Sequence, residues 1–261
     1  MLARPKMDDL GAGKALVYKS NNMLERRLRI LREARRMIAE TASIDFSMEE
    51  LCARAGVAKN TIYNAFGNKE NVIASAIQQY IVDFSSTVTS VHDPLSLTGR
   101  LERTIKSSVG LPQIRAYTTI IFALYNSSKV DPQIRAAIRG VAVRLHTPFV
   151  ERLAELGQLA PGTTAEQMVA ALTSSVYAVH SDWTHGEVQD HALVDRICEA
   201  ALVVTAGFTY GALREEALGW LDSLRMRDAR WMELLKLGEA PRQRGSRRPV
   251  EPAPEVQSAE G

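Results

Sequence analysis

The sequence predicts an all-α protein made of a small N-terminal helical domain and a larger helical domain. Apolar residues recur every three to four positions along most of the chain, which is the spacing of one helix face. Capping residues and prolines mark where several helices begin, as at Asp131-Pro132. No stretch alternates apolar and polar residues for long enough to form a strand. We expect residues 23–70 to form the small domain and residues 71–237 the large one.

A first helix is expected over residues 24–40. One face of it is apolar and carries Leu24, Leu28, Leu31 and Ile38. The opposite face carries three arginines, Arg26, Arg29 and Arg36. Those arginines either face solvent or contact a polyanion such as DNA.

Residues 47–66 predict two short helices joined by a tight turn. Ser47 and Glu50 have the spacing of a capping box, in which the serine accepts a backbone N–H and the glutamate reaches back to the cap. Gly56 stands where helices end in a left-handed residue, a conformation that glycine adopts without strain. Ile62 and Phe66 then repeat at i and i+4 and form the buried edge of the second helix.

The second helix turns a polar face outward, opposite its apolar edge. This face carries Lys59, Asn60, Tyr63 and Asn64. Asparagine can bond an adenine edge twice, while lysine and the tyrosine hydroxyl can hold phosphates or bases. Such a face, braced by a second helix, suits the major groove of DNA.

Residues 46–73, which read FSMEELCARAGVAKNTIYNAFGNKENVI, resemble the DNA-binding domain of TetR-family transcriptional regulators. The run from Gly56 to Glu70 is the most specific part, because it fixes turn, core and phosphate-contact positions together. The resemblance implies an N-terminal three-helix helix-turn-helix DNA-binding domain and a larger helical ligand-binding and dimerisation domain. Beyond this stretch the chain resembles the family in length and helical character only.

The resemblance also implies which residues contact DNA. Asn60, Thr61, Tyr63 and Asn64 would read bases or hold phosphates together with Lys59, and Ser47 and Lys69 would hold the DNA backbone. Lys69 begins a helix, where the helix dipole favours an anion, so a phosphate beside it would explain its position. Two residues depart from the family pattern. Ala58 replaces a common Ser or Thr and Asn60 replaces a small residue, so base preferences do not carry over.

Basic charge gathers at the N-terminal end of the chain. Residues 1–70 carry 13 Lys/Arg against 9 Asp/Glu, while residues 71–233 carry 14 against 17. This distribution fits a DNA-binding head on an acidic body, although ordinary surface scatter gives similar numbers. We expect residues 1–22 to be a flexible basic arm, either plainly disordered or lying along DNA, and residues 238–261 to be a disordered tail.

The large domain should contain further helices after a long one that starts near Lys69. They are expected over residues 97–109, 113–125, 131–156, from a Thr163–Glu166 capping box to about Trp183, 193–208 and 213–237. The last of these would cover either a dimer seam or the body of the domain.

Two of these helices are rich in small residues that permit close helix approach. They are Ala170, Ala171, Ser174, Ser175 and Ala178 on one helix and Ala200, Ala201, Ala206, Gly207 and Gly211 on or just beyond the next. The two helices either pack only within the chain or pair with their copies as a four-helix bundle. TetR-like proteins dimerise in this way, and recognition of a palindrome also favours a homodimer.

The resemblance further implies an apolar cavity for a small-molecule effector of unknown identity. Candidate lining residues are Tyr117, Phe122, Tyr125, His146, Phe149, Tyr177 and His180, which combine apolar surface with a few polar atoms. Each is equally understandable as a core residue.

Other functional classes lack sequence support. Cys52 and Cys198 lie far apart with no secretory signal before them, so we expect buried, reduced thiols in a cytoplasmic protein. No apolar run approaches the ~20 residues of a membrane span. No nucleophile elbow, carboxylate pair or nucleotide loop is present, so we expect neither catalysis nor a cofactor. His180, Asp182 and His185 are close in sequence, but a helix would place His180 and His185 about 140° apart, off a shared face, which argues against a metal site.

Together these observations predict a homodimeric transcriptional regulator that binds a palindromic operator in double-stranded DNA, most simply a repressor released by a small molecule. The alternatives are an activator, a regulator without an effector, or a helical binding module whose DNA-binding head is vestigial.

Overall fold

The computed structural model describes residues 9–41, 43–86 and 91–239, and within these ranges the chain is helical and has no strand. The described chain divides into two compact units, an N-terminal unit (Met1–Ala76) and a C-terminal unit (Ile77–Gly261). The division falls inside helix α4 (Lys69–Ser86), beyond the boundary expected at residue 70. The predicted all-α fold class is confirmed.

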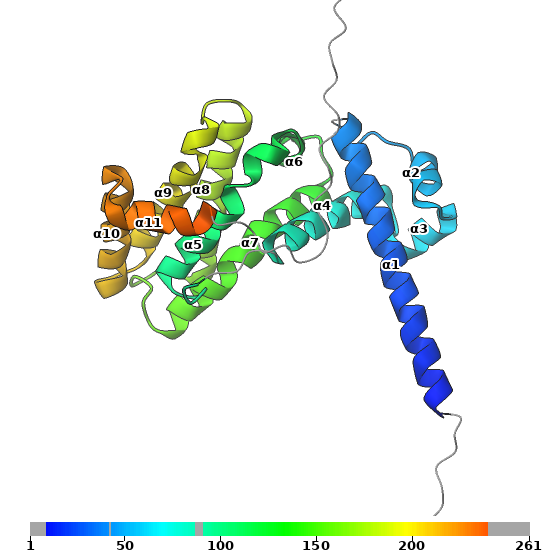
Figure 1. The fold of residues 1–261 in the computed structure, drawn as a ribbon, viewed down its shortest axis with the longest axis horizontal. Helices are drawn as coiled ribbons and strands as arrows, with labels where there is room; N and C mark the ends of the chain where they lie inside the picture. Colours follow the sequence, from blue (N-terminus) through cyan, green and yellow to red (C-terminus); the bar gives the residue numbers. More distant parts are fainter. Residues whose placement is uncertain (1–8, 42, 87–90, 240–261) are drawn as a thin grey trace, which may run out of the picture. The chain divides into compact units, whose positions relative to one another are not determined.

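The N-terminal unit consists of α1 (Asp9–Thr41), α2 (Met48–Ala55), α3 (Lys59–Phe66) and the first part of α4 (Figure 1). The two short helices joined by a turn are present as expected, and they lie beside α1. Their core is made of buried apolar side chains, among them Ile30, Leu31, Ala34, Met37 and Ile38 from α1 and Leu51, Ile62, Phe66 and Ile73 from the other helices.

Helix α1 differs from the prediction in its length and in its apolar face. It begins at Asp9, so residues 9–22 are helical and the expectation of an irregular arm is wrong for them; residues 1–8 lie outside the described residues. The physical reason is that lengthening an existing helix adds a backbone hydrogen bond for each residue fixed. Leu24, predicted to lie on the apolar face, is 55% exposed.

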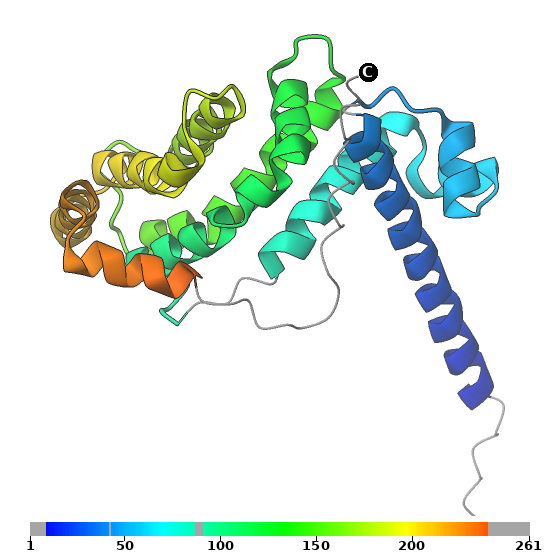
Figure 2. The ribbon, with the colours of Figure 1, turned by 45° about the horizontal axis from the view of Figure 1, so that its top comes forward.

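The C-terminal unit contains the rest of α4 and a series of further helices. These are α5 (Leu97–Ser108), the 3-10 turn η1 (Leu111–Ile114), α6 (Arg115–Asn126), α7 (Pro132–Glu155), α8 (Ala165–Thr184), α9 (Asp190–Phe208), α10 (Gly211–Met226) and α11 (Ala229–Glu239). Helices α7 to α10 pack successively against one another, and α5 packs against α9 (Figure 2). The predicted start of α7 is confirmed, because Asp131 accepts a hydrogen bond from the Gln133 N–H at 2.7 Å and Pro132 is the first helical residue.

The capping box of α8 lies one residue beyond its predicted place. Thr164 and Gln167 form both of its hydrogen bonds, at 3.2 and 2.9 Å, so the Thr163–Glu166 prediction is wrong. Thr163 is occupied in the preceding turn, where its hydroxyl donates to the Ala160 carbonyl at 2.6 Å.

The helix predicted over residues 213–237 is in fact two helices, α10 and α11. Arg227 adopts the left-handed conformation (φ 48°), which ends α10, and Asp228 then caps α11 by accepting the Trp231 N–H at 3.0 Å. A non-glycine residue in this conformation costs about 1–2 kcal/mol. Bonds from the Arg227 guanidinium and the Trp231 indole to Asp195 help to offset that cost.

The two helices at the end of the described region pack on different parts of the C-terminal unit. Helix α10 packs on α9, and α11 (orange in Figure 1) turns back and packs against α5. The C-terminal helices therefore cover the body of the unit. Residues 240–261, most of the predicted disordered tail, lie outside the described residues.

Both cysteines are free thiols, and they differ in burial. Cys198 is fully buried, whereas Cys52 is half-buried rather than buried as expected. Among the described helices, none combines the length and apolar character needed to cross a membrane.

Candidate nucleic-acid interface and ligand cavity

The turn between α2 and α3 is built by local capping interactions. The Ser47 hydroxyl accepts the Glu50 N–H at 3.0 Å, as predicted. Glu50 does not complete the capping box, because its carboxylate binds Arg54 at 2.8 Å instead. Gly56 is left-handed (φ 60°) and donates to the Ala53 carbonyl, and the next residue's N–H reaches Cys52. This pair of bonds satisfies the last carbonyls of α2 and sets the direction in which α3 leaves.

Helix α3 separates an apolar side from a polar side. Ile62 and Phe66 are buried in the unit. The opposite side is exposed, with Tyr63 40% exposed, and it is made of Lys59, Asn60, Tyr63 and Asn64. Thr61, the remaining predicted contact on this helix, is half-buried.

Lys59 has an intramolecular partner that the sequence analysis did not identify. Its ammonium group forms an ion pair with Glu49 on α2 and lies 6.0 Å from the Tyr63 ring. The hydrogen bond between Lys59 and Glu49 raises the pKa of the lysine and lowers that of the glutamate. Exposed pairs of this kind contribute little to stability, so a phosphate can compete with Glu49 for the lysine.

Lys69 also has an intramolecular contact, which offers another reason for its position. Its ammonium lies 4.9 Å from the centre of the buried Phe46 ring, a cation–π distance. The start of α4 is capped by Asn68, whose side-chain oxygen accepts the Asn71 N–H at 2.7 Å. The contact with Phe46 therefore gives a reason within the protein for a lysine at the start of α4.

Arg27 on α1 positions helix α3, a role that the sequence analysis did not predict. Its guanidinium donates to the Ala65 carbonyl at 2.8 Å and lies 4.2 Å above the Phe66 ring. It thus holds the C-terminal end of α3 against α1. The partner is a backbone carbonyl 38 residues away, so no local pattern in the sequence signals the contact.

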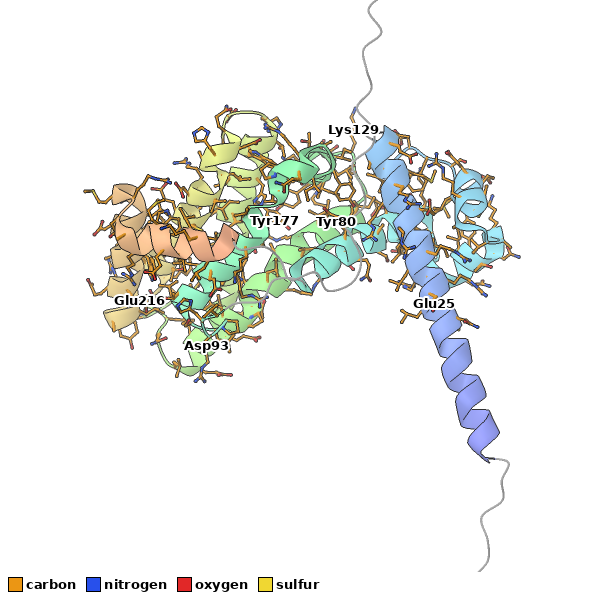
Figure 3. The ribbon with its side chains drawn as sticks, viewed as in Figure 1. Glu25, Tyr80, Asp93, Lys129, Tyr177 and Glu216 are labelled. Atoms are coloured by element: carbon orange, nitrogen blue, oxygen red, sulfur yellow. The ribbon has the colours of Figure 1, made fainter. Side chains whose placement is uncertain are left out.

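The C-terminal unit contains a partly open cavity of about 180 Å³. Residues from α4 to α9 line it, including Tyr80 and Tyr177, both labelled in Figure 3. Five of the seven predicted lining residues border it: Tyr117, Phe122, His146, Tyr177 and His180. Tyr125 is not a lining residue but packs edge-on against Tyr177 at 5.1 Å, and Phe149 lies in the neighbouring apolar core.

One wall of the cavity is an aromatic cluster. Phe122 stacks on the imidazole of His180 at 5.2 Å and meets the Tyr177 ring edge-on at 5.1 Å. The Tyr177 hydroxyl donates to the Ile138 carbonyl at 2.6 Å, and burial raises its pKa. Burial also lowers the pKa of His180. This wall therefore presents uncharged groups to the cavity.

Helix α5 also contributes to the lining, and the sequence analysis did not connect this helix with a ligand. Arg100 and Arg103 both line the cavity. Arg100 donates to the Leu145 carbonyl at 2.8 Å and also contacts Nδ1 of His146. Burial, followed by the charge of Arg100, lowers the pKa of His146 to about 2, so its imidazole is neutral and Nδ1 is the acceptor. In the sequence these arginines look like the solvated side of an amphipathic helix.

Among the residues that the structure describes, no group of three His, Cys, Asp or Glu side chains lies close enough together to hold a metal ion.

Sequence comparisons find one family model that matches residues 30–76. It is the model of the bacterial regulatory proteins of the tetR family. An uncharacterised HTH-type transcriptional regulator of Bacillus subtilis (strain 168), YvaF, is 28% identical over 85 residues, which are 33% of this chain. The chain spans 44% of the length of that curated relative.

Solved structures resemble more of the chain. SmeT, the repressor of the Stenotrophomonas maltophilia multidrug efflux pump SmeDEF, has a TM-score of 0.51 at 22% identity, over 72% of this chain and 92% of that one. TylP, a TetR regulator from Streptomyces fradiae, has a TM-score of 0.53 at 16% identity, over 80% of this chain and 94% of that one. At such low sequence identities these matches show a similar fold only, and the similarity includes the C-terminal unit.

Proposed function

We propose that this chain, which belongs to the TetR family of bacterial regulatory proteins and is a regulator rather than an enzyme, acts in the cytoplasm as a homodimer that binds a palindromic operator through α3. The observation that carries the proposal is the exposed polar face of α3, on a helix held from behind by α2 and by Arg27. Amide, ammonium and phenol groups on such a face can reach base edges and phosphates in the major groove. Ser47 and Lys69 would contact the DNA backbone beside it.

Exposed small residues on α8 and α9 support the homodimer. Ser174 and Ala178 on α8 and Gly207 on α9 are exposed. Val203, also on α9, is 50% exposed. Because α8 and α9 also pack against each other, their outer surface can meet its copy as a four-helix bundle. A two-fold axis at this surface would place one α3 in each half of a palindrome.

Repression relieved by a small molecule is the form of regulation that we favour. The cavity of about 180 Å³ in the C-terminal unit would hold the effector. An effector can shift the dimer away from its DNA-binding state only by as much as it prefers the other state. Activation, or regulation without an effector, would use the same DNA-binding surface.

The test is selection of bound duplexes from a random DNA pool, repeated over a series of salt concentrations. We expect enrichment of a palindrome and an affinity that falls steeply with salt, since phosphate contacts release counterions. Weak binding without sequence preference, with and without candidate ligands, would contradict the proposal.

Replacing Tyr63 by Phe tests whether the Tyr63 hydroxyl contacts DNA. If the hydroxyl holds a phosphate, the variant should bind every operator sequence more weakly, by roughly the 0.5–1.5 kcal/mol net value of one hydrogen bond. Tyr210→Phe is the matched control, because this tyrosine is similarly exposed but lies in the C-terminal unit, where its hydroxyl donates to Gly157. Equal affinities of the Tyr63→Phe variant and the parent would remove Tyr63 from the DNA contacts.

A further inference from the structure

We infer that the cavity of the C-terminal unit takes an amphipathic organic anion, whose negative end meets Arg100 and Arg103 and whose apolar body lies against α6 to α9. The inference rests on the proposed function, because it names the chemical class of the effector. Its support comes from the charges, contacts and size of the cavity.

The cavity contains positive charge without a matching negative charge. Its lining includes two arginines and, among the described residues, no aspartate or glutamate. The described contacts of Arg100 are to neutral acceptors, the Leu145 carbonyl and the His146 imidazole. Burial, and after it the charge of Arg103, lowers the pKa of Arg100 to about 10, so the Arg100 guanidinium remains charged at neutral pH.

Several other arginines of the same unit are paired with carboxylates, whereas Arg135 and Arg139 bond the Ser127 carbonyl and the Tyr125 hydroxyl. Arg115 binds Asp190 at 2.9 Å, Arg225 binds Glu199 at 3.2 Å, and Arg227 binds Asp195. These pairs are at least partly exposed, where a missing partner would cost little because water would replace it. Arg100, whose guanidinium is desolvated, therefore lacks a carboxylate partner where pairing would matter most.

An unpaired charge in an apolar site is unfavourable, and a bound anion removes the cost. A guanidinium has five N–H donors, and the two described contacts of Arg100 leave further donors for a ligand. Carboxylates and phosphates fit this fork with two parallel hydrogen bonds. An anionic end on the ligand would thus complete the site.

The rest of the lining requires an apolar body. Apart from the α5 residues, the lining consists largely of aliphatic side chains and aromatic rings, among them Ile121, Phe122, Val141, Val176, Ile197 and Ala201. The nearby Tyr177 hydroxyl is already bonded to Ile138. A volume of about 180 Å³ is close to the ~150 Å³ of apolar cavities that accept benzene, so the body should be a single ring or a short alkyl chain.

Matched pairs of probes test the inference on the full chain. Benzoate is compared with benzyl alcohol, and octanoate with octan-1-ol, by thermal shift and calorimetric titration. We expect at least one carboxylate to bind ten-fold or more tightly than its alcohol and to raise the melting temperature with concentration. Equal or tighter binding of both alcohols, or no binding of any of the four probes, would overturn the inference.

Substitution of the two arginines identifies the site. Arg100→Gln and Arg103→Gln should each weaken the preferred carboxylate at least ten-fold and leave alcohol binding unchanged, while Arg214→Gln, on the exposed side of α10, should change neither. Arg103 makes no described hydrogen bond or ion pair within the protein, so its variant should fold even if the Arg100 variant does not. Carboxylate affinity that survives in Arg103→Gln and in every folded Arg100 variant would contradict the assignment.

The operator experiment separates this inference from the proposed function. Operator binding without carboxylate binding would overturn the ligand class and leave the regulator standing. Carboxylate binding through Arg100 without operator binding would support the ligand class and contradict the proposed function.

Discussion

Helix α5 carries charged side chains on two of its sides, and these side chains differ in whether the protein supplies a partner of opposite charge. Glu102 is fully buried and receives hydrogen bonds from the Lys106 ammonium at 2.6 Å and from the backbone N–H groups of Val91 and His92 at 2.8 and 3.0 Å, with the His92 ring 2.9 Å away. Arg100, two residues earlier and about 200° around the helix, faces the cavity with neutral acceptors.

The difference between Glu102 and Arg100 distinguishes a charge that stabilises the fold from a charge that is available to a ligand. Buried polar groups in folded proteins are nearly always satisfied, and Glu102 follows that rule by fastening residues 91–92 to α5. Arg100 lacks the ionic partner that would repay its desolvation. A charge that the fold leaves uncompensated beside a cavity is most simply explained by a ligand that compensates it.

Replacing Glu102 by Gln should have the largest effect on stability. The substitution keeps the size of the side chain but removes the buried negative charge that pairs with the Lys106 ammonium, and it replaces one acceptor oxygen with an N–H donor. Breaking a buried pair in this way costs about 3–5 kcal/mol in the free energy of unfolding, which urea titration would measure.

The matched control for that prediction is Glu151→Gln, at an exposed position of α7. Surface substitutions of this kind stay within about 0.5 kcal/mol. If the two variants lost equal stability, Glu102 would not be the anchor of the segment before α5, and the two sides of the helix would no longer differ.

How far the sequence predicts the molecule depends on how local each interaction is. The Ser47 cap, the Gly56 turn and the buried Ile62 and Phe66 were predicted because each depends on neighbours within a few residues. Arg27 was missed, because its partner carbonyl is distant in the chain. The DNA-contact residues remain predictions, since an exposed face does not record what binds it.

The large unit was harder to predict for the same reason. Its helices were expected, but the break at Arg227 has no glycine to announce it and depends on Asp195 from another helix. The aromatic residues near the cavity could be proposed from residue type. The role of Arg100 could not, because an arginine on an amphipathic helix normally faces solvent.

The contribution of Glu102 to the stability of the protein should depend on pH, and we expect this effect to be of intermediate size among the predictions. Burial by itself would raise the pKa of Glu102, but the bonds from Lys106, His92 and Val91 outweigh it and hold the pKa at about 2, below the ordinary 4.5. A carboxyl group with a lowered folded-state pKa stabilises the protein fully above the unfolded value and loses that contribution as pH falls from about 4.5 to about 2.

Melting temperatures of the parent and of Glu102→Gln between pH 6 and pH 2 measure this contribution. The difference between the two proteins should be constant above about pH 5 and should shrink as the pH falls through that window, since other carboxyl groups titrate equally in both. A difference that stayed constant down to pH 2 would mean that the Glu102 carboxylate is not the titrating group.

Replacing Arg100 by Gln should have the smallest effect on the stability of the ligand-free protein, and its sign is the informative part. Glutamine can still donate to the Leu145 carbonyl, while the substitution removes a desolvated charge and its repulsion from Arg103. We expect the free energy of unfolding to change by less than about 1 kcal/mol, with an increase more natural than a decrease. A loss of several kcal/mol, comparable to that of Glu102→Gln, would show that Arg100 holds α5 to α7 as a structural group. Near-equal stability together with lost carboxylate binding is the combination that a ligand-binding arginine produces, because sites that serve ligands commonly do so at some cost to the stability of the empty protein.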